Sequence, residues 1–177
     1  IAGVGTFFPS NNLTVSDDLY ISNGTSVINL STYNLNIGVN LDSVGTITGA
    51  GSSTTTLTGT GKKIGAAIGT ANCYNLVING TYTLEGDVST VKDVTINAAK
   101  QLDLGEKNIS VSGSLLSSGT IVSSGTNGTL TLAGVGTAPG ATATSTTVDY
   151  LVVSGTYTLN NTITIDKNDQ WSIDLEQ

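Results

Sequence analysis

The chain repeats itself, and this repeat limits the possible folds more than any single motif does. Residues 76–84 read LVINGTYTL and residues 151–159 read LVVSGTYTL, which match at seven of nine positions with an offset of 75. The same offset relates LTGTG at residues 57–61 to LAGVG at residues 132–136. Self-similarity at a fixed spacing is the signature of repeat architectures. The sequence therefore predicts a tandem duplication of about 75 residues with small insertions and deletions.

A shorter period lies within the duplicated unit, because pairs of apolar residues separated by one residue recur along the chain. Apolar residues that alternate with a period of two are typical of β-strands. In five of the nine cases a glycine stands two residues after the pair, where it allows the chain to bend. No segment has a helical period. The second members of the pairs, spaced by 15 to 21 residues, are Ile21, Ile37, Leu57, Ile78, Ile96, Val111, Leu132, Val153 and Ile173.

This regular interval favours an all-β parallel β-solenoid, in which each unit forms one rung of a coil and equivalent residues stack on each other. The nine pairs predict about nine rungs averaging 19 residues. A β-sandwich is the alternative, although its antiparallel strands seldom repeat in sequence. For the domain organisation we expect an apolar N-terminal arm over residues 1–12 and a single solenoid domain over 13–177. Its repeat units cover about 13–87 and 88–162, with a partial third unit over 163–177.

The composition excludes several classes of function. The 177 residues include six lysines, no Arg and no His, and the net charge is −7. Nucleic-acid binding is not expected without clustered positive charge. Without His, neither a Ser-His or Cys-His pair nor an HExxH zinc site can form, so we expect no enzyme, cofactor or metal site. No run of about 18 apolar residues is present, so no membrane span is expected. The single Cys73 is interpreted as a small buried hydrophobe.

Three polar patterns leave room for more than one interpretation. The carboxylates cluster at Asp17-Asp18, at residues 85–87 and at residues 166–169, either as solvated turn residues or as a weak calcium site. Thr-x-Thr pairs recur, and on one flat face they would form the hydroxyl array of an ice-binding protein. Threonine is also simply a good strand residue. Tyr82 and Tyr157 are repeat equivalents that either pack on the solenoid wall or present a platform for a sugar.

Asn-x-Ser/Thr sequons are slightly more frequent than the composition predicts, which indicates either a glycosylated surface protein or coincidence. The candidate glycosylation sites are Asn12, Asn23, Asn29, Asn79, Asn108, Asn127 and Asn160.

Residues 74–84, together with Val94-Thr-Ile, Leu102-Asp-Leu-Gly and Ile109-Ser-Val-Ser-Gly, resemble the repeats of large secreted bacterial and archaeal surface proteins. These adhesin-like proteins are built as right-handed parallel β-helices, and the resemblance covers roughly residues 13 to 175. It implies an extracellular or cell-surface location and a structural or adhesive role. It brings no catalytic residues.

A solenoid has two open ends, where unpaired strand edges can accept another chain. Natural solenoids normally cover these ends with a cap, and no capping helix is evident in the sequence. Either the chain is a fragment of a longer array, or neighbouring subunits satisfy its ends. The candidate subunit contacts are the apolar residues near the termini, namely Ile1, Val4, Phe7, Phe8, Trp171, Ile173 and Leu175.

We therefore expect a structural subunit of an extracellular filament or cell-surface assembly, whose partner is another copy joined head to tail. The low charge fits this expectation, because like charges stacked in register about 4.8 Å apart would repel each other. The second expectation is an adhesin module that binds surface glycans. The third is an ice-binding protein.

Overall fold

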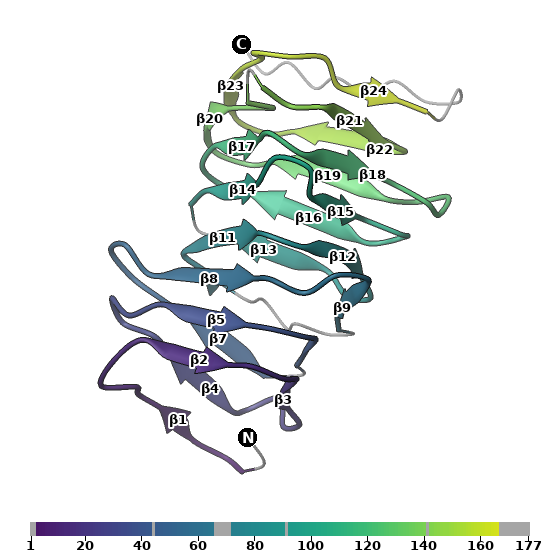
Figure 1. Cartoon of the computed structure of the whole chain (residues 1–177). Coiled ribbons are helices and arrows are strands. Elements are labelled where there is room, and N and C mark those ends of the chain that lie inside the picture. The colour runs from purple at the N-terminus through teal and green to yellow at the C-terminus, as the bar shows by residue number, and fades with distance from the viewer. Residues whose placement is uncertain (1–2, 44, 66–71, 91, 141, 167–177) are drawn as a thin grey trace.

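The fold is a parallel β-solenoid (Figure 1). The computed structural model describes residues 3–43, 45–65, 72–90, 92–140 and 142–166, and over these residues it contains 24 strands of two to four residues and no helix. All strand pairs among them are parallel. The predicted all-β solenoid is therefore confirmed, and the β-sandwich, whose strands pair antiparallel, is excluded.

The strands lie on three faces, designated A, B and C, and each turn of the coil passes from B to C to A. Face A carries β1 (Thr6–Phe7), β4 (Val27–Asn29), β7 (Thr46–Thr48), β10 (Asn72–Cys73), β13 (Val88–Thr90), β16 (Asn108–Val111), β19 (Thr129–Leu132) and β22 (Tyr150–Val153). Face B carries β2 (Leu13–Val15), β5 (Leu35–Ile37), β8 (Thr54–Leu57), β11 (Asn75–Ile78), β14 (Val94–Ile96), β17 (Leu115–Ser117), β20 (Val135–Thr137) and β23 (Thr156–Thr158). Face C carries β3 (Leu19–Ile21), β6 (Leu41–Ser43), β9 (Lys62–Ile64), β12 (Thr81–Leu84), β15 (Gln101–Asp103), β18 (Thr120–Val122), β21 (Ser145–Val148) and β24 (Thr164–Ile165).

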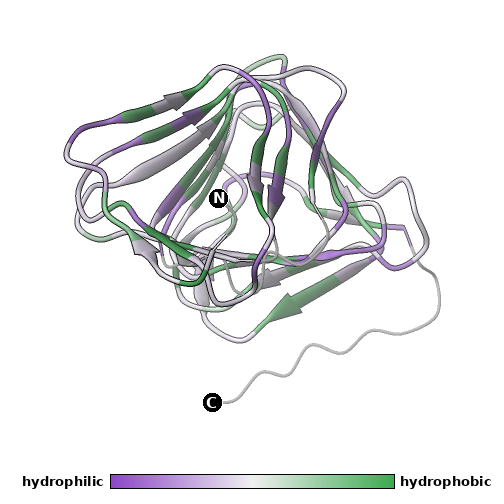
Figure 2. Cartoon of the chain, turned by 90° about the horizontal axis from the view of Figure 1, so that it is seen from below, coloured by the Kyte–Doolittle hydropathy of each residue, from purple (hydrophilic) through white to green (hydrophobic). Residues whose placement is uncertain are grey.

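The hydrophobic core fills the interior that the three faces enclose, which is roughly triangular when viewed along the axis (Figure 2). Alternate residues of each strand point inward, and pairing in register places one apolar residue on the next. On face B, for example, Ile37, Leu57, Ile78 and Ile96 form one continuous, fully buried column. The alternation in the sequence therefore gives a core one side chain deep on each face.

The predicted rung count of nine is wrong, because the chain makes about seven turns. Face C has eight strands from β3 to β24, which lie seven turns apart. The apolar pairs counted in the sequence do not all lie on one face: Ile21 lies on face C, Ile37 to Ile96 on face B, and Val111 to Val153 on face A. The two short intervals of 16 and 15 residues, before Ile37 and before Val111, are each a step of two strands rather than a full turn. A full turn takes 18 to 22 residues along β2 to β17 of face B.

The 75-residue duplication does not contain a whole number of turns. Its first copy, residues 76–84, forms β11 and β12, and its second copy, residues 151–159, forms β22 and β23. The copies are thus eleven strands apart, which is three full turns and two further strands. Each copy folds in the same way but on a different pair of faces, B and C for the first copy and A and B for the second.

Candidate functional site

Ladders of Asn and Asp side chains hold the corners of the solenoid together. At the corner that leads into face B, the Asn34 backbone N–H donates to Asn12 Oδ1 at 2.9 Å, and the Thr54 N–H donates to Asn34 Oδ1 at 2.9 Å. At the corner into face C, Asn40 donates to Asp18 Oδ1, and the Lys63 N–H donates to Asn40 Oδ1, both at 2.9 Å. Each side chain thus supplies the acceptor that a backbone N–H of the next turn needs.

Carboxylates hold other turns in the same way. Asp87 accepts from the Asn108 N–H at 2.9 Å, Asp93 from the Ser114 N–H at 2.8 Å, and Asp103 from the Ser124 N–H at 3.0 Å. Buried Asp149 accepts from the Gly128 N–H at 2.7 Å. Within the described residues, no group of three or more His, Cys, Asp or Glu side chains is placed to hold a metal ion. The carboxylates lie in turns, as predicted, but several of them connect neighbouring turns rather than being only solvated.

The repeat-equivalent tyrosines pack in the wall and tie three successive turns together. Tyr82 is fully buried; its hydroxyl accepts from the Gly59 N–H and donates to the Val39 carbonyl, each at 2.8 Å. The half-buried Tyr157 accepts from the Gly134 N–H at 3.3 Å and lies 2.8 Å from the carbonyl oxygens of Val111 and Gly113. Burial raises the pKa of both phenols. Tyr82 is too deep in the core to act as a platform for a sugar.

Cys73 is buried, as predicted, and burial raises the pKa of its thiol from 9.0 to about 11. Its environment resembles that of a small core hydrophobe rather than that of a reactive thiolate, which needs an electropositive, partly exposed site.

The sequon asparagines are scattered around the solenoid. Asn12, Asn127 and Asn160 are exposed, and the other four are half-buried. Asn23 is part of a tight turn, where its Oδ1 accepts both the N–H and the hydroxyl of Thr25, at 2.9 and 2.7 Å. The Thr-x-Thr pairs are also scattered: β8, β12, β19 and β23 place them on all three faces. A hydroxyl array of the ice-binding kind needs a single face.

The N-terminal end of the solenoid exposes apolar side chains and open strand edges. Strand β1 pairs with β4 and places Phe7 in register with the fully buried Ile28. Phe7 is still 43% exposed, because no described turn lies below it, and Phe8 and Val4 are 64% and 81% exposed. Among the described residues, β1, β2 and β3 each have a neighbouring strand on one side only. Ile1, the remaining predicted contact at this end, lies outside the described residues.

The C-terminal end has the same features. Val153 stands in register on the buried Leu132 but is itself exposed, and so are Val152 and Leu159. In the described part of the chain, β22, β23 and β24 are the last strands on faces A, B and C. The predicted contacts Trp171, Ile173 and Leu175 lie outside the described residues.

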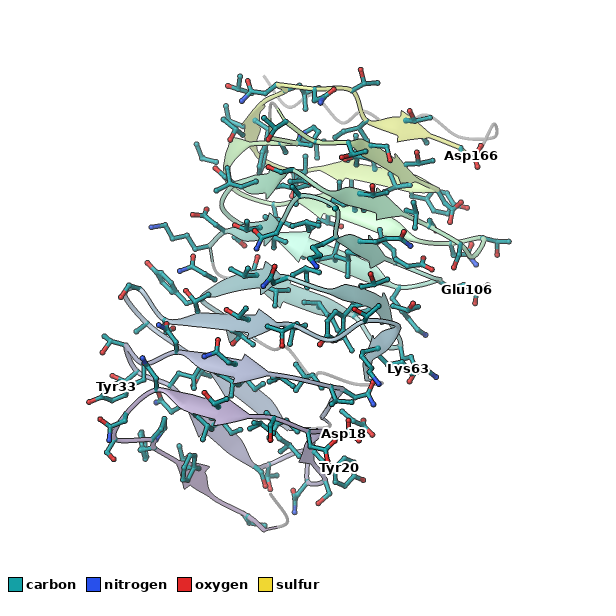
Figure 3. The ribbon with its side chains drawn as sticks, in the orientation of Figure 1. Asp18, Tyr20, Tyr33, Lys63, Glu106 and Asp166 are labelled. Carbon is teal, nitrogen blue, oxygen red and sulfur yellow. The ribbon has the colours of Figure 1, made fainter. Side chains whose placement is uncertain are left out.

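A third feature, which the sequence did not reveal, is a polar hollow on the outside of face C with a volume of about 230 Å³. Its lining comes from four successive turns, and Figure 3 labels three of the lining residues, Asp18, Tyr20 and Lys63, on one side of the molecule. These side chains are 20 or more residues apart in the sequence, and only the register of β3, β6, β9 and β12 brings them together. That register could not be read from a sequence whose turns differ in length.

No protein family model matches this sequence, and comparisons with curated proteins and with solved structures gave no match. No helix in the described ranges is long and apolar enough to cross a membrane.

Proposed function

We propose that this chain is a structural subunit of an extracellular filament or cell-surface assembly, in which copies join head to tail through the ends of the solenoid. The observation that carries the proposal is the match between the two ends: each exposes one open strand from each of the three faces. Open edges of parallel strands are templates for further pairing.

The order and direction of the exposed strands fit a continuous coil. The last described strands follow one another as β22 on face A, β23 on B and β24 on C, and the first are β1 on A, β2 on B and β3 on C. All pairing is parallel, so a second copy placed above β22 to β24 would continue the coil without reversing any strand. Such a contact joins the head of one copy to the tail of the next, and it extends into a filament rather than closing into a dimer.

The apolar side chains at the ends supply a driving force for this contact. Phe7 and Phe8 at one end and Val153 at the other are all more exposed than the core residues on which their strands stack. Fully burying one such phenylalanine contributes about 1.5 to 3 kcal/mol. Burying both phenylalanines is therefore enough to shift an association constant by more than tenfold.

The extracellular location, the adhesin-like relationship and glycosylation belong to the same proposal. They are supported by the resemblance of residues 74–84 and the following strands to secreted surface repeats, and by the exposed sequons at Asn12, Asn127 and Asn160. The proposal is not enzymatic, in keeping with a chain that has no His and no Arg.

The proposal is tested by replacing the apolar residues of one end. The Phe7→Ser, Phe8→Ser double variant should raise the concentration needed for polymerisation at least tenfold, measured by sedimentation and negative-stain microscopy. Deleting residues 1–8 should abolish polymers while leaving the β content unchanged in circular dichroism. Leu116→Ser is the matched control, because Leu116 is 42% exposed, like Phe7, but lies on β17 in the side wall.

Two results would overturn the proposal. One is a wild-type protein that stays monomeric at high concentration. The other is polymerisation that survives the deletion of residues 1–8, or that responds to Leu116→Ser as strongly as to the phenylalanine variant.

A further inference from the structure

The hollow on face C lies between two columns of outward-facing residues. In the first column the strand register and the corner hydrogen bonds stack Asp18, Asn40 and Lys63. In the second, the pairing of Leu19 with Leu41, Leu41 with Ile64 and Ile64 with Leu84 places the following residues Tyr20, Asp42, Gly65 and Glu85 in one row. The row covers three steps of about 4.8 Å, so the hollow runs along the solenoid axis.

Gly65 creates the hollow because it leaves a gap in the second column. A Cβ at this position would lie 2.5 Å from Asp42 Oδ1 and 2.8 Å from Asp42 Cα. The backbone is drawn close here, since the Gly65 N–H donates to the Leu41 carbonyl at 2.6 Å. Tyr20 and Asp42 therefore border the gap on one side and Glu85 on the other.

The polar groups around the gap are held in place before any ligand arrives. Asp18 Oδ1 accepts from both the backbone N–H and the side-chain amide of Asn40, each at 2.9 Å. Asn40 Oδ1 accepts from the Lys63 N–H, and the Lys63 ammonium forms an ion pair with Glu85. Groups that are already ordered lose less conformational entropy on binding.

The chemistry of the lining selects the class of ligand. Carboxylates only accept hydrogen bonds, an ammonium only donates, and a carboxamide does both. A ligand that meets all three within one small hollow needs groups that donate and accept equally well, as hydroxyl groups do. The 54%-exposed side chain of Tyr20 adds an apolar ring face at the edge. Three carboxylates against one lysine leave the lining with a net charge of −2, which disfavours an anion.

We propose that this hollow binds a neutral oligosaccharide, which lies along face C with one sugar ring against Tyr20 and its hydroxyl groups on Asp42, Asn40 and Lys63. The site lies on the side wall and shares no residue with the ends of the solenoid. Its function does not depend on polymerisation, and in a polymer it would recur once in each subunit.

The test is binding of neutral and acidic trisaccharides, measured by titration calorimetry and protein NMR on the Phe7→Ser, Phe8→Ser background as well as on the unchanged chain. The probes are β-linked glucose, β-linked N-acetylglucosamine and α-linked galacturonate trimers. Tyr20→Ala should weaken the binding of a neutral trimer at least tenfold. Tyr33→Ala is the control, because Tyr33 is a partly exposed tyrosine on another side of the molecule (Figure 3) and should change the affinity less than twofold.

A second variant, Asp42→Asn, should also weaken binding while circular dichroism shows an unchanged fold. The proposal is overturned if no neutral trimer binds at millimolar concentration or if the galacturonate trimer binds more tightly than the neutral ones. It is also overturned if Tyr20→Ala and Tyr33→Ala have equal effects. Because the background variant is directed at polymerisation alone, failure of the sugar site and failure of the assembly proposal give different results.

Discussion

The two copies of the repeated motif, residues 76–84 and 151–159, have the same local structure in very different surroundings. In the first copy Tyr82 lies in the middle of the solenoid and is fully buried, with turns packed below and above it. In the second copy Tyr157 lies near the C-terminal end and is only half-buried, although its hydroxyl makes the same kind of contact with the two turns below. A repeated sequence thus repeats its hydrogen bonds, while its contribution to stability depends on what is stacked upon it.

The largest difference between the copies is expected from removal of the two tyrosine side chains. Tyr82→Ala should cost about 3 to 5 kcal/mol in the free energy of unfolding, because it opens a cavity in a closed core and leaves the Gly59 N–H without its acceptor. Tyr157→Ala should cost less than half as much. Urea denaturation of both variants measures the difference, and equal losses would show that the position in the stack does not matter.

A second difference is expected at alkaline pH, where Cys73 distinguishes the copies because its repeat equivalent is Val148. The thiol has a pKa of 9.0 when unperturbed and about 11 in the fold, so the unfolded chain loses its proton first. The stability that Cys73 contributes is therefore complete below pH 9 and falls by about 2 to 3 kcal/mol as the pH rises to 11.

The variant Cys73→Val makes the first copy like the second at this position and should remove that loss. Denaturation at pH 8 and pH 11 provides the measurement. Burial also raises the pKa of Tyr82, so a smaller alkaline loss that begins near pH 10 should remain in the variant. An unchanged slope between pH 9 and 10 in Cys73→Val would contradict the interpretation.

The corner glycines should show a smaller difference in the same direction. A Cβ at Gly80 would lie 1.8 Å from the Gly59 carbonyl oxygen, and one at Gly155 would lie 1.9 Å from that of Gly134. Both alanine variants must push neighbouring turns apart, at a cost of about 1 to 3 kcal/mol. Gly80→Ala should have the larger cost, because a turn is packed on either side of it. Thermal melts would reveal the ranking, and a larger loss in Gly155→Ala would reverse the argument.

The smallest expected effect is electrostatic. Asp93 helps to raise the pKa of Tyr157, although burial is the larger cause. Asp93→Asn removes the charge but keeps an acceptor for the Ser114 N–H. The pKa of Tyr157 should therefore fall while that of Tyr82 stays unchanged, as followed by ultraviolet titration with Tyr157→Phe as the reference. A shift at Tyr82 would indicate a general change in the fold.

The sequence predicted the strands well, because alternation of apolar residues directly determines which side chains enter the core. It did not predict the number of turns, because a step around a corner and a step up the stack both appear as an apolar pair followed by a turn. Ile37 and Val111 were counted as new rungs for this reason. The hollow around Gly65 was missed for a related reason, since it depends on the register between turns of unequal length.

The sequence predicted the candidate contacts at the N-terminal end correctly as far as the described residues go. Val4, Phe7 and Phe8 are exposed there, because a strand that begins a stack has a partner above it and none below. The corner carboxylates had a role that their spacing did not indicate. Asp87, for example, accepts a hydrogen bond from a residue 21 positions further along the chain, and a sequence motif of a few residues cannot show this.

The mismatch between the duplication and the turn has a consequence for how such a surface changes over time. Duplicating a 75-residue unit moves every feature of the wall three turns along and two faces around the axis. A further copy of the face C hollow made in this way would appear on face B, and another on face A. Gene duplication would therefore distribute one binding site around all sides of a fibre, without any mutation that redirects it.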